Sequence, residues 1–142
     1  MENLQRDVRL FHYGAGHPVA KYPSTPPPAT MALRLRLLEE EYTELVEALT
    51  EAGYPASAKQ LGSIAKESAD LIYVVLGILV TYGIDMEPVW KEVQATNMDK
   101  LRGPKRDDGK QLKPEGWQAP DIEAIIWDQI DAEAEKVWSQ PL

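Results

Sequence analysis

The apolar positions of this chain recur about every three to four residues over long stretches, a spacing that predicts amphipathic helices. Glycine, proline and capping residues mark where these helices should end, with Gly83 as a C-terminal stop and Asp85 as an N-cap. In chain order, the predicted elements are a short helix over residues 3–13, an extended proline-rich connector over 18–28, long helices over 29–52 and 57–82, a helix over 85–100, a long loop over 101–119 and a final helix over 120–138. We find no convincing strand, so the predicted fold class is all-α.

The second long helix stands out because it is apolar on every side from Leu71 to Val80. A helix of this kind is normally buried all round, and a single domain of this size has difficulty surrounding it. We therefore expect it to pack against a second subunit. The run covers only about half the length that crosses a bilayer, so no membrane partner is expected.

Composition and charge narrow the class of protein further. The chain has 142 residues, a formal net charge of −8 and no cysteine. This is the size of one domain, without disulfides or thiolate metal ligands. An acidic chain is a poor general binder of nucleic acid, so no nucleic-acid partner is expected. Its basic residues are nevertheless concentrated at Lys100, Arg102, Lys105, Arg106, Lys110 and Lys113, a segment that suits a compact polyanion.

Three glutamates occupy a side of the first long helix where leucine is expected. With Glu40 set at zero, Glu44 lies at about 40° and Glu41 at about 100° around the helix axis. The same sector contains Leu33 and Leu37 upstream and Ala48 downstream. The acids are therefore predicted to be in line with a packing face. A solvated acidic face is the alternative interpretation, because glutamate is common on helices.

The second long helix repeats this anomaly with Glu67 and Asp70, which are one turn apart. Carboxylates at a helix interface are costly unless something neutralises them. Acids that converge from two helices form the oxygen-rich ligand set that hard divalent cations prefer. A di-iron site is less favoured, because neither His12 nor His17 follows a glutamate by three residues. Both histidines are left without a predicted role.

The acids and their order also resemble a known family. Glu40-Glu41-Tyr42-Thr43-Glu44 followed by Glu67-Ser68-Ala69-Asp70 resembles the E-E-x-x-E … E-x-x-D signature of the all-α, MazG-like nucleoside triphosphate pyrophosphohydrolases. The likeness continues through the segments 70–74, 82–85, 97–100 and 108–117, and covers roughly residues 30–122. Within this family the chain resembles small dimeric enzymes of bacteria and phages, some acting on dUTP and others, of the MazZ type, on dGTP.

The resemblance implies a role for each group of residues. The implied metal ligands are Glu41, Glu44, Glu67 and Asp70, with Mg²⁺ or Mn²⁺ as two or three ions per site. Glu40 would be a further ligand or the base that orients the attacking water. The implied substrate-binding residues are Asn97, Lys100, Arg106, Lys110, Lys113 and Trp117. The core would be a four-helix bundle completed by dimerisation, in a homodimer or a dimer of dimers.

These inferences combine into one expected function. We expect metal-dependent hydrolysis of a (deoxy)nucleoside triphosphate to the monophosphate and diphosphate, with dGTP favoured over dUTP. A non-catalytic module that binds a cation and a phosphorylated partner is the alternative. The expected division is an N-terminal helix and connector over residues 1–28, a catalytic domain over 29–122 and a C-terminal helix over 123–142. The first residues lack a signal-peptide pattern, so we expect the cytoplasm, or the host cytoplasm for a phage protein.

Overall fold

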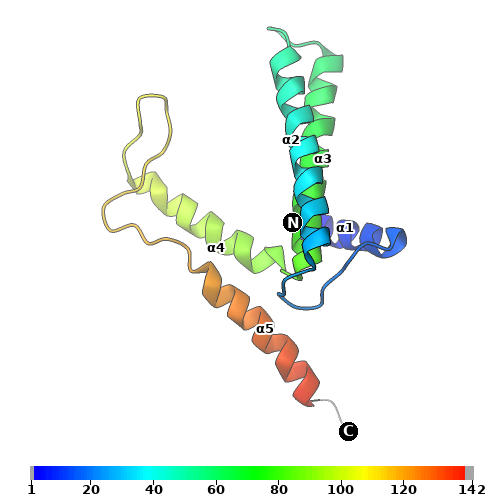
Figure 1. Cartoon of the computed structure of the whole chain (residues 1–142). Coiled ribbons are helices and arrows are strands. Elements are labelled where there is room, and N and C mark those ends of the chain that lie inside the picture. Colours follow the sequence, from blue (N-terminus) through cyan, green and yellow to red (C-terminus); the bar gives the residue numbers. More distant parts are fainter. Residues whose placement is uncertain (1, 140–142) are drawn as a thin grey trace. The chain divides into compact units, whose positions relative to one another are not determined.

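The computed structural model describes the backbone of residues 2–139 and the side chains of residues 4–136. Its helices are α1 (Glu2–Ala15), α2 (Pro28–Glu51), α3 (Ala58–Tyr82), α4 (Met86–Asp99), a 3-10 turn (Lys100–Arg102) and α5 (Ile122–Ser139), as drawn in Figure 1. No strand occurs between residues 2 and 139, where an isolated bridge joins Lys105 and Gln111. The predicted all-α class is confirmed.

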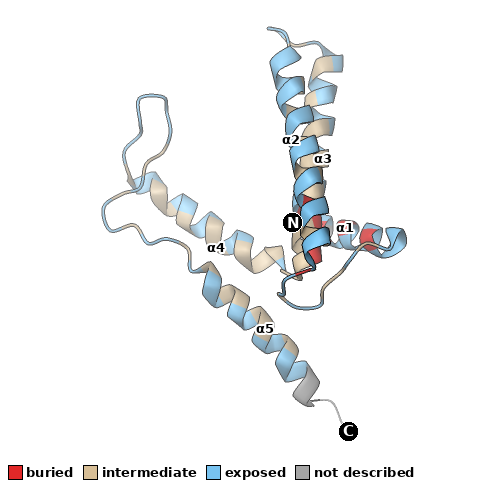
Figure 2. Cartoon of the chain, viewed as in Figure 1, coloured by how far each residue is buried: buried red, intermediate tan, exposed pale blue. Residues whose placement is uncertain are grey.

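The chain divides into two compact units, Met1–Ile84 and Asp85–Leu142. In the first unit, α2 and α3 run antiparallel and lie side by side along their length, while α1 packs against α3 (Figure 1). The fully buried apolar side chains of the described residues are Val8 from α1 and Leu76 and Val80 from α3. The buried positions accordingly gather where α1 meets the helix pair (Figure 2). The core of this unit is small.

The ends of α3 follow from local chemistry. Ser57 and Gln60 form a capping box, in which the Ser57 hydroxyl accepts from the Gln60 amide and the Gln60 side chain accepts from the Ser57 amide. At the other end Gly83 adopts a left-handed conformation with φ of 73° and donates its N–H to carbonyls of the last turn. Asp85 then caps α4 by accepting from the Glu87 amide. The predicted stop at Gly83 and the predicted N-cap at Asp85 are both confirmed.

The connector between α1 and α2 is attached to the C-terminal end of α3. The Ala20 amide donates to the Val80 carbonyl at 3.1 Å, and the Ser24 amide donates to the Tyr82 carbonyl at 2.9 Å. These carbonyls belong to the last turn, where the usual intrahelical donors are missing, although the Val80 carbonyl also accepts from the Gly83 cap at 3.3 Å. The connector therefore supplies donors to the end of the helix, and holds α1 and α2 in place around α3.

The apolar second half of α3 is covered on only part of its circumference. Leu76 and Val80 are buried, whereas Ile72, Tyr73 and Val75 remain exposed. One chain alone therefore does not bury this helix on every side, as expected from the sequence, and its packing against a second subunit stays a prediction. The physical reason is that α1 and α2 occupy two sides of α3 and the first unit supplies no further helix.

The second unit is built from α4, the 3-10 turn, a long loop and α5. Helices α4 and α5 contact each other. The Gln129 carboxamide accepts from the Asp85 amide at 2.8 Å and donates to the Asp85 carbonyl at 3.0 Å, which fixes the start of α4 against α5. Among the described residues no single helix has the length and apolar character of a membrane span. Helix α3 and the segment Met86–Arg102 together have that length and apolar character, but the chain bends between them.

Candidate active site

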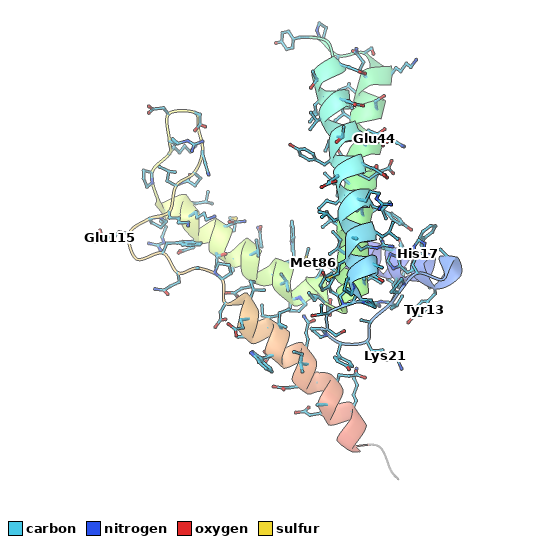
Figure 3. The ribbon with its side chains drawn as sticks, viewed as in Figure 1. Tyr13, His17, Lys21, Glu44, Met86 and Glu115 are labelled. Carbon is cyan, nitrogen blue, oxygen red and sulfur yellow. The ribbon has the colours of Figure 1, made fainter. Side chains whose placement is uncertain are left out.

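Three of the acids predicted as metal ligands come together between α2 and α3. Glu41 from α2 and Glu67 and Asp70 from α3 each offer one carboxylate oxygen, and these oxygens lie within 4.8 Å of one another. All three residues are half-buried. We call them the acid trio. Figure 3 shows this part of the helix pair, with Glu44 labelled on α2.

The trio forms because the interhelical seam repeats along both helices. A Cβ on Gly77 would lie 3.1 Å from Nη1 of Arg34, and about two turns further along the pair Glu41 meets Asp70. The buried and half-buried positions on this side of α2 include Arg34, Leu37, Leu38, Glu41, Leu45 and Ala48. Glu41 therefore lies in the seam. Glu40, which is one residue or about 100° away, is exposed and outside the trio.

The trio contains polar atoms that nothing in the described protein satisfies. Oε2 of Glu41 and Oε2 of Glu67 are both buried without a hydrogen-bond partner among the described residues. Buried polar atoms are normally paired, and an unpaired carboxylate oxygen is especially costly. Two such oxygens within one all-oxygen cluster fit a divalent cation such as Mg²⁺ or Mn²⁺, which would supply the missing partner. The residues present therefore fit a resident metal ion.

The electrostatics of Glu41 agree with this interpretation. Burial raises the pKa of Glu41 above its ordinary value, and the negative charges of Glu44, Asp70 and Glu67 raise it further. Crowding of like charges is expected where a cation normally balances them. Glu44 is exposed and lies outside the trio, yet it is close enough to Glu41 to affect that pKa by charge and by a hydrogen bond. It borders the trio on α2.

One basic residue at this site was missed from the sequence. The Lys66 ammonium lies 2.7 Å from Oδ2 of Asp70 and 3.5 Å from Oε1 of Glu67. Lysine and aspartate four residues apart on a helix commonly pair, so Lys66 and Asp70 carried a usable signal. That signal is weak, because a lysine one turn from an acid is also ordinary on any solvated helix surface.

The predicted substrate-binding residues lie in the second unit, where Trp117 organises several of them. The Trp117 indole N–H donates to the Thr96 carbonyl at 2.8 Å, which fixes the ring against the end of α4. The Lys100 and Lys113 ammonium groups lie 5.1 and 4.9 Å from the centre of that ring. Lys100 also donates to Oδ1 of Asn97 at 2.9 Å. Four of the predicted residues thus form one cluster.

The other two predicted residues, Arg106 and Lys110, lie in the loop. Nε of Arg106 donates to Oδ1 of Asp108 at 2.8 Å, and the Lys110 carbonyl accepts from the Arg106 amide at 2.7 Å. The loop is closed by the Gln111 carboxamide, which donates to the Lys100 and Gly103 carbonyls. Arg106 therefore has an acidic partner, but an exposed pair of this kind is weak and can exchange for another anion.

Comparison with known families gives a match over most of the chain. Residues 8–97 match the family model described as phosphoribosyl-ATP pyrophosphohydrolase. The matched segment covers more than half of the chain. The chain belongs to this family. A search of curated individual proteins found no match to this chain.

Membership of the phosphoribosyl-ATP pyrophosphohydrolase family places the chain within the MazG-like all-α superfamily that the acidic motif resembles. The matched segment includes the trio, Glu40, Glu44 and Asn97, and it ends before the basic loop. It begins within α1, earlier than the resemblance drawn from the motif alone. Family membership supports a hydrolase that acts on triphosphate-like nucleotides. The roles of the individual acids remain predictions.

The two histidines for which the sequence predicts no role, His12 and His17, both contact Arg34. His12 is buried at 2% exposure, and its Nδ1 lies 3.0 Å from the Pro18 carbonyl while its Nε2 lies 3.4 Å from Nη1 of Arg34. Nη2 of Arg34 approaches Nδ1 of His17 at 3.5 Å. These contacts assign Nδ1 of His12 as the donor and Nε2 as an acceptor. The cluster joins α1, the connector and α2.

Proposed function

We propose that this chain hydrolyses a (deoxy)nucleoside triphosphate to the monophosphate and diphosphate in a metal-dependent reaction, with dGTP as the preferred substrate. The observation that carries the proposal is the pair of buried, unpartnered carboxylate oxygens of Glu41 and Glu67, within a segment that matches a pyrophosphohydrolase family. These oxygens are costly to the fold. Their presence in the seam is explained by a bound cation and not by packing.

Each group of residues has a proposed task. Glu41, Glu67 and Asp70 hold the cations, with Glu44 as a further ligand beside Glu41. Glu40, which is exposed at the edge of the cluster, orients the water that attacks phosphorus. When bound, Mg²⁺ or Mn²⁺ ions supply positive charge that stabilises the bridging and leaving oxygens of the triphosphate. Two or three ions are proposed for each site.

The cationic cluster of the second unit is proposed to bind the phosphates. Lys100 and Lys113 are both held against the Trp117 ring, so two positive charges are arranged before substrate arrives. Arg106 and Lys110 add charge from the same loop. Positioned cations of this kind are the principal contribution of a protein to phosphoryl transfer. The face of Trp117 is occupied by these ammonium groups, which favours a role in phosphate binding over base stacking.

The test is a substrate survey with product identification. The protein would be incubated with each common NTP and dNTP, including dGTP and dUTP, in the presence of Mg²⁺ or Mn²⁺. Formation of the monophosphate and intact diphosphate is expected, fastest with dGTP. A faster reaction with dUTP than with dGTP would make dUTP the proposed substrate and leave the proposed reaction unchanged. Absence of turnover with every nucleotide would overturn the proposal and favour a non-catalytic cation-binding module.

Two matched variants test the ligand assignment. Glu67→Gln and Asp70→Asn are expected to lower kcat at least 100-fold, because each removes a charged ligand and leaves the side chain almost unchanged in shape. Glu39→Gln is the control, since Glu39 is an exposed glutamate on α2 outside the seam, and it should retain wild-type activity. Circular dichroism would verify that helical content is unchanged. An active Asp70→Asn enzyme would show the ligand assignment to be wrong.

The family match favours one further candidate substrate. The matching family is described by its action on phosphoribosyl-ATP, which carries the same triphosphate group on a larger nucleotide. The proposed site would act on that group in the same way. Phosphoribosyl-ATP therefore belongs in the survey, and a kcat/KM for it well above that for dGTP would replace dGTP as the proposed substrate.

A further inference from the structure

The Lys66 ammonium contacts one oxygen of each of two carboxylates on α3, those of Glu67 and Asp70. It lies 3.5 Å from Oε1 of Glu67, whereas Oε2 of the same carboxylate is buried and has no partner among the described residues. On Asp70 it lies 2.7 Å from Oδ2. Each carboxylate thus has one oxygen held by an ammonium group. In Glu67 the other oxygen is directed into the protein.

The exposure of these groups supports the same division. The Lys66 side chain is 66% exposed, while that of Glu67 is 18% exposed. Lys66 therefore lies on the solvent side of the trio and does not fill its centre. An exposed ion pair contributes little to folding stability, so the loss of Lys66 is expected to leave the fold intact.

We propose that Lys66 is a positioning residue of the acid trio, which holds one oxygen each of Glu67 and Asp70 so that the buried oxygen of Glu67 is presented, beside that of Glu41, to a divalent cation. This inference rests on the metal site of the proposed function. Groups that hydrogen-bond to metal ligands commonly fix their orientation, and their loss typically weakens metal binding by about 10- to 100-fold.

Charge and positioning predict opposite effects for the loss of Lys66. If the ammonium acted only through its positive charge, its removal would strengthen the binding of a cation nearby. If it positions the carboxylates, its removal lets Glu67 and Asp70 change rotamer and weakens binding. The direction of the change in affinity therefore distinguishes the two roles.

The experiment measures binding of Mn²⁺ alone, by isothermal titration calorimetry at fixed ionic strength and without nucleotide. Lys66→Met and Lys66→Gln are expected to bind Mn²⁺ about tenfold more weakly than wild type, and Lys66→Arg is expected to recover most of the loss. Lys59→Met is the matched control, because Lys59 is an exposed lysine on the same helix, and its affinity should equal that of wild type. Circular dichroism would check the fold of each variant.

The outcomes separate this inference from the proposed function. Equal or tighter Mn²⁺ binding by both Lys66 variants, or a change in KM for nucleotide without a change in Mn²⁺ affinity, would overturn the positioning role and leave the proposed function intact. Weaker binding in a protein that hydrolyses no nucleotide would support the role of Lys66 and overturn the proposed function. A wild-type protein that binds no Mn²⁺ would overturn both.

Discussion

Glu41 places a carboxylate in the α2–α3 seam, where packing alone would favour an apolar side chain. Its Oε2 is buried without a partner among the described residues, and burial and three neighbouring carboxylates raise its pKa. Residues that serve a bound ion commonly destabilise the protein that lacks the ion. Glu41 should therefore destabilise the metal-free protein and stabilise the metal-bound protein.

The substitution Glu41→Gln tests this opposition. Removing the charge relieves repulsion within the cluster, so the metal-free variant is expected to have a Tm about 2–4 °C above that of the metal-free wild type. The same change removes a charged ligand, so the increase in Tm on addition of Mn²⁺ should be smaller than in wild type. Thermal denaturation with EDTA and with excess Mn²⁺ measures both effects. A variant less stable than wild type in EDTA would contradict the account.

His12 provides a pH-dependent contribution to stability. Burial lowers its pKa below the ordinary value near 6.5; the hydrogen bond to Pro18 raises it in part, and Arg34 and His17 lower it. Between the lowered pKa and pH 6.5 the unfolded chain binds a proton that the folded protein does not. By linkage, stability is present above that window and decreases as the pH falls through it.

We therefore expect the wild-type protein to lose up to about 1 kcal/mol of stability between pH 6.5 and 5.5 through this one residue. Urea denaturation at several pH values measures the loss. His12→Asn and His12→Gln cannot titrate, so both should have a shallower dependence of stability on pH. Both should also be less stable at neutral pH, because they disturb the buried contacts of His12 with Pro18 and Arg34. An unchanged slope in both variants would show that His12 does not cause it.

At the scale of the helices, the ends could be predicted because their chemistry is local. Gly83 and Asp85 act on the backbone within a few residues, so the sequence alone locates them. The rotation of α2 could not be predicted in the same way. Glu40 and Glu41 differ by only about 100°, and contact with α3 decides which of them lies in the seam. The site was therefore predicted as a cluster, while the exposure of Glu40 and the pairing of Lys66 required the structure.

Two glycines, one within α3 and one at its C-terminal cap, test the attachment of the connector. Gly83 has a φ of 73°, and a Cβ there would overlap the backbone of Tyr22. Gly83→Ala should therefore cost about 2–4 kcal/mol, from the left-handed conformation and from displacement of the connector. Gly62 lies within α3, and a Cβ at this position would have nothing within 4 Å, so Gly62→Ala should stabilise the protein by about 0.5–1 kcal/mol.

Urea denaturation should therefore give a lower free energy of unfolding than wild type for Gly83→Ala and a higher one for Gly62→Ala. The comparison keeps the chemical change constant, since both substitutions replace glycine by alanine, and it contrasts a helical position with the left-handed cap. A neutral Gly83→Ala variant would mean that the connector does not approach α3 as closely as the structure has it.

For the whole molecule, the small core has a consequence for assembly. The described residues bury only three apolar side chains fully, Val8, Leu76 and Val80. Many others on the α2–α3 pair are exposed, among them Leu33, Leu35, Val46, Leu49, Leu61, Ile72, Tyr73 and Val75. Fully burying one such side chain contributes about 1.5–3 kcal/mol, and exposed apolar surface of this extent is typical of an interface. We therefore propose that two chains pair through these helices and complete a four-helix core.

The proposed homodimer predicts that a charge at Ile72 will dissociate the two chains while each chain stays folded. Ile72 is 48% exposed, so Ile72→Glu removes little packing from a single chain and should still dissociate the proposed homodimer. Sedimentation equilibrium is expected to give a dimer or a dimer of dimers for wild type and a monomer for the variant, with a Tm that rises with concentration only for wild type. Tyr54→Glu is the control, because Tyr54 is fully exposed at the turn between α2 and α3. A wild type that is monomeric and unfolds cooperatively would contradict the proposed assembly, because one chain would then fold without a partner to cover the exposed side chains of α2 and α3.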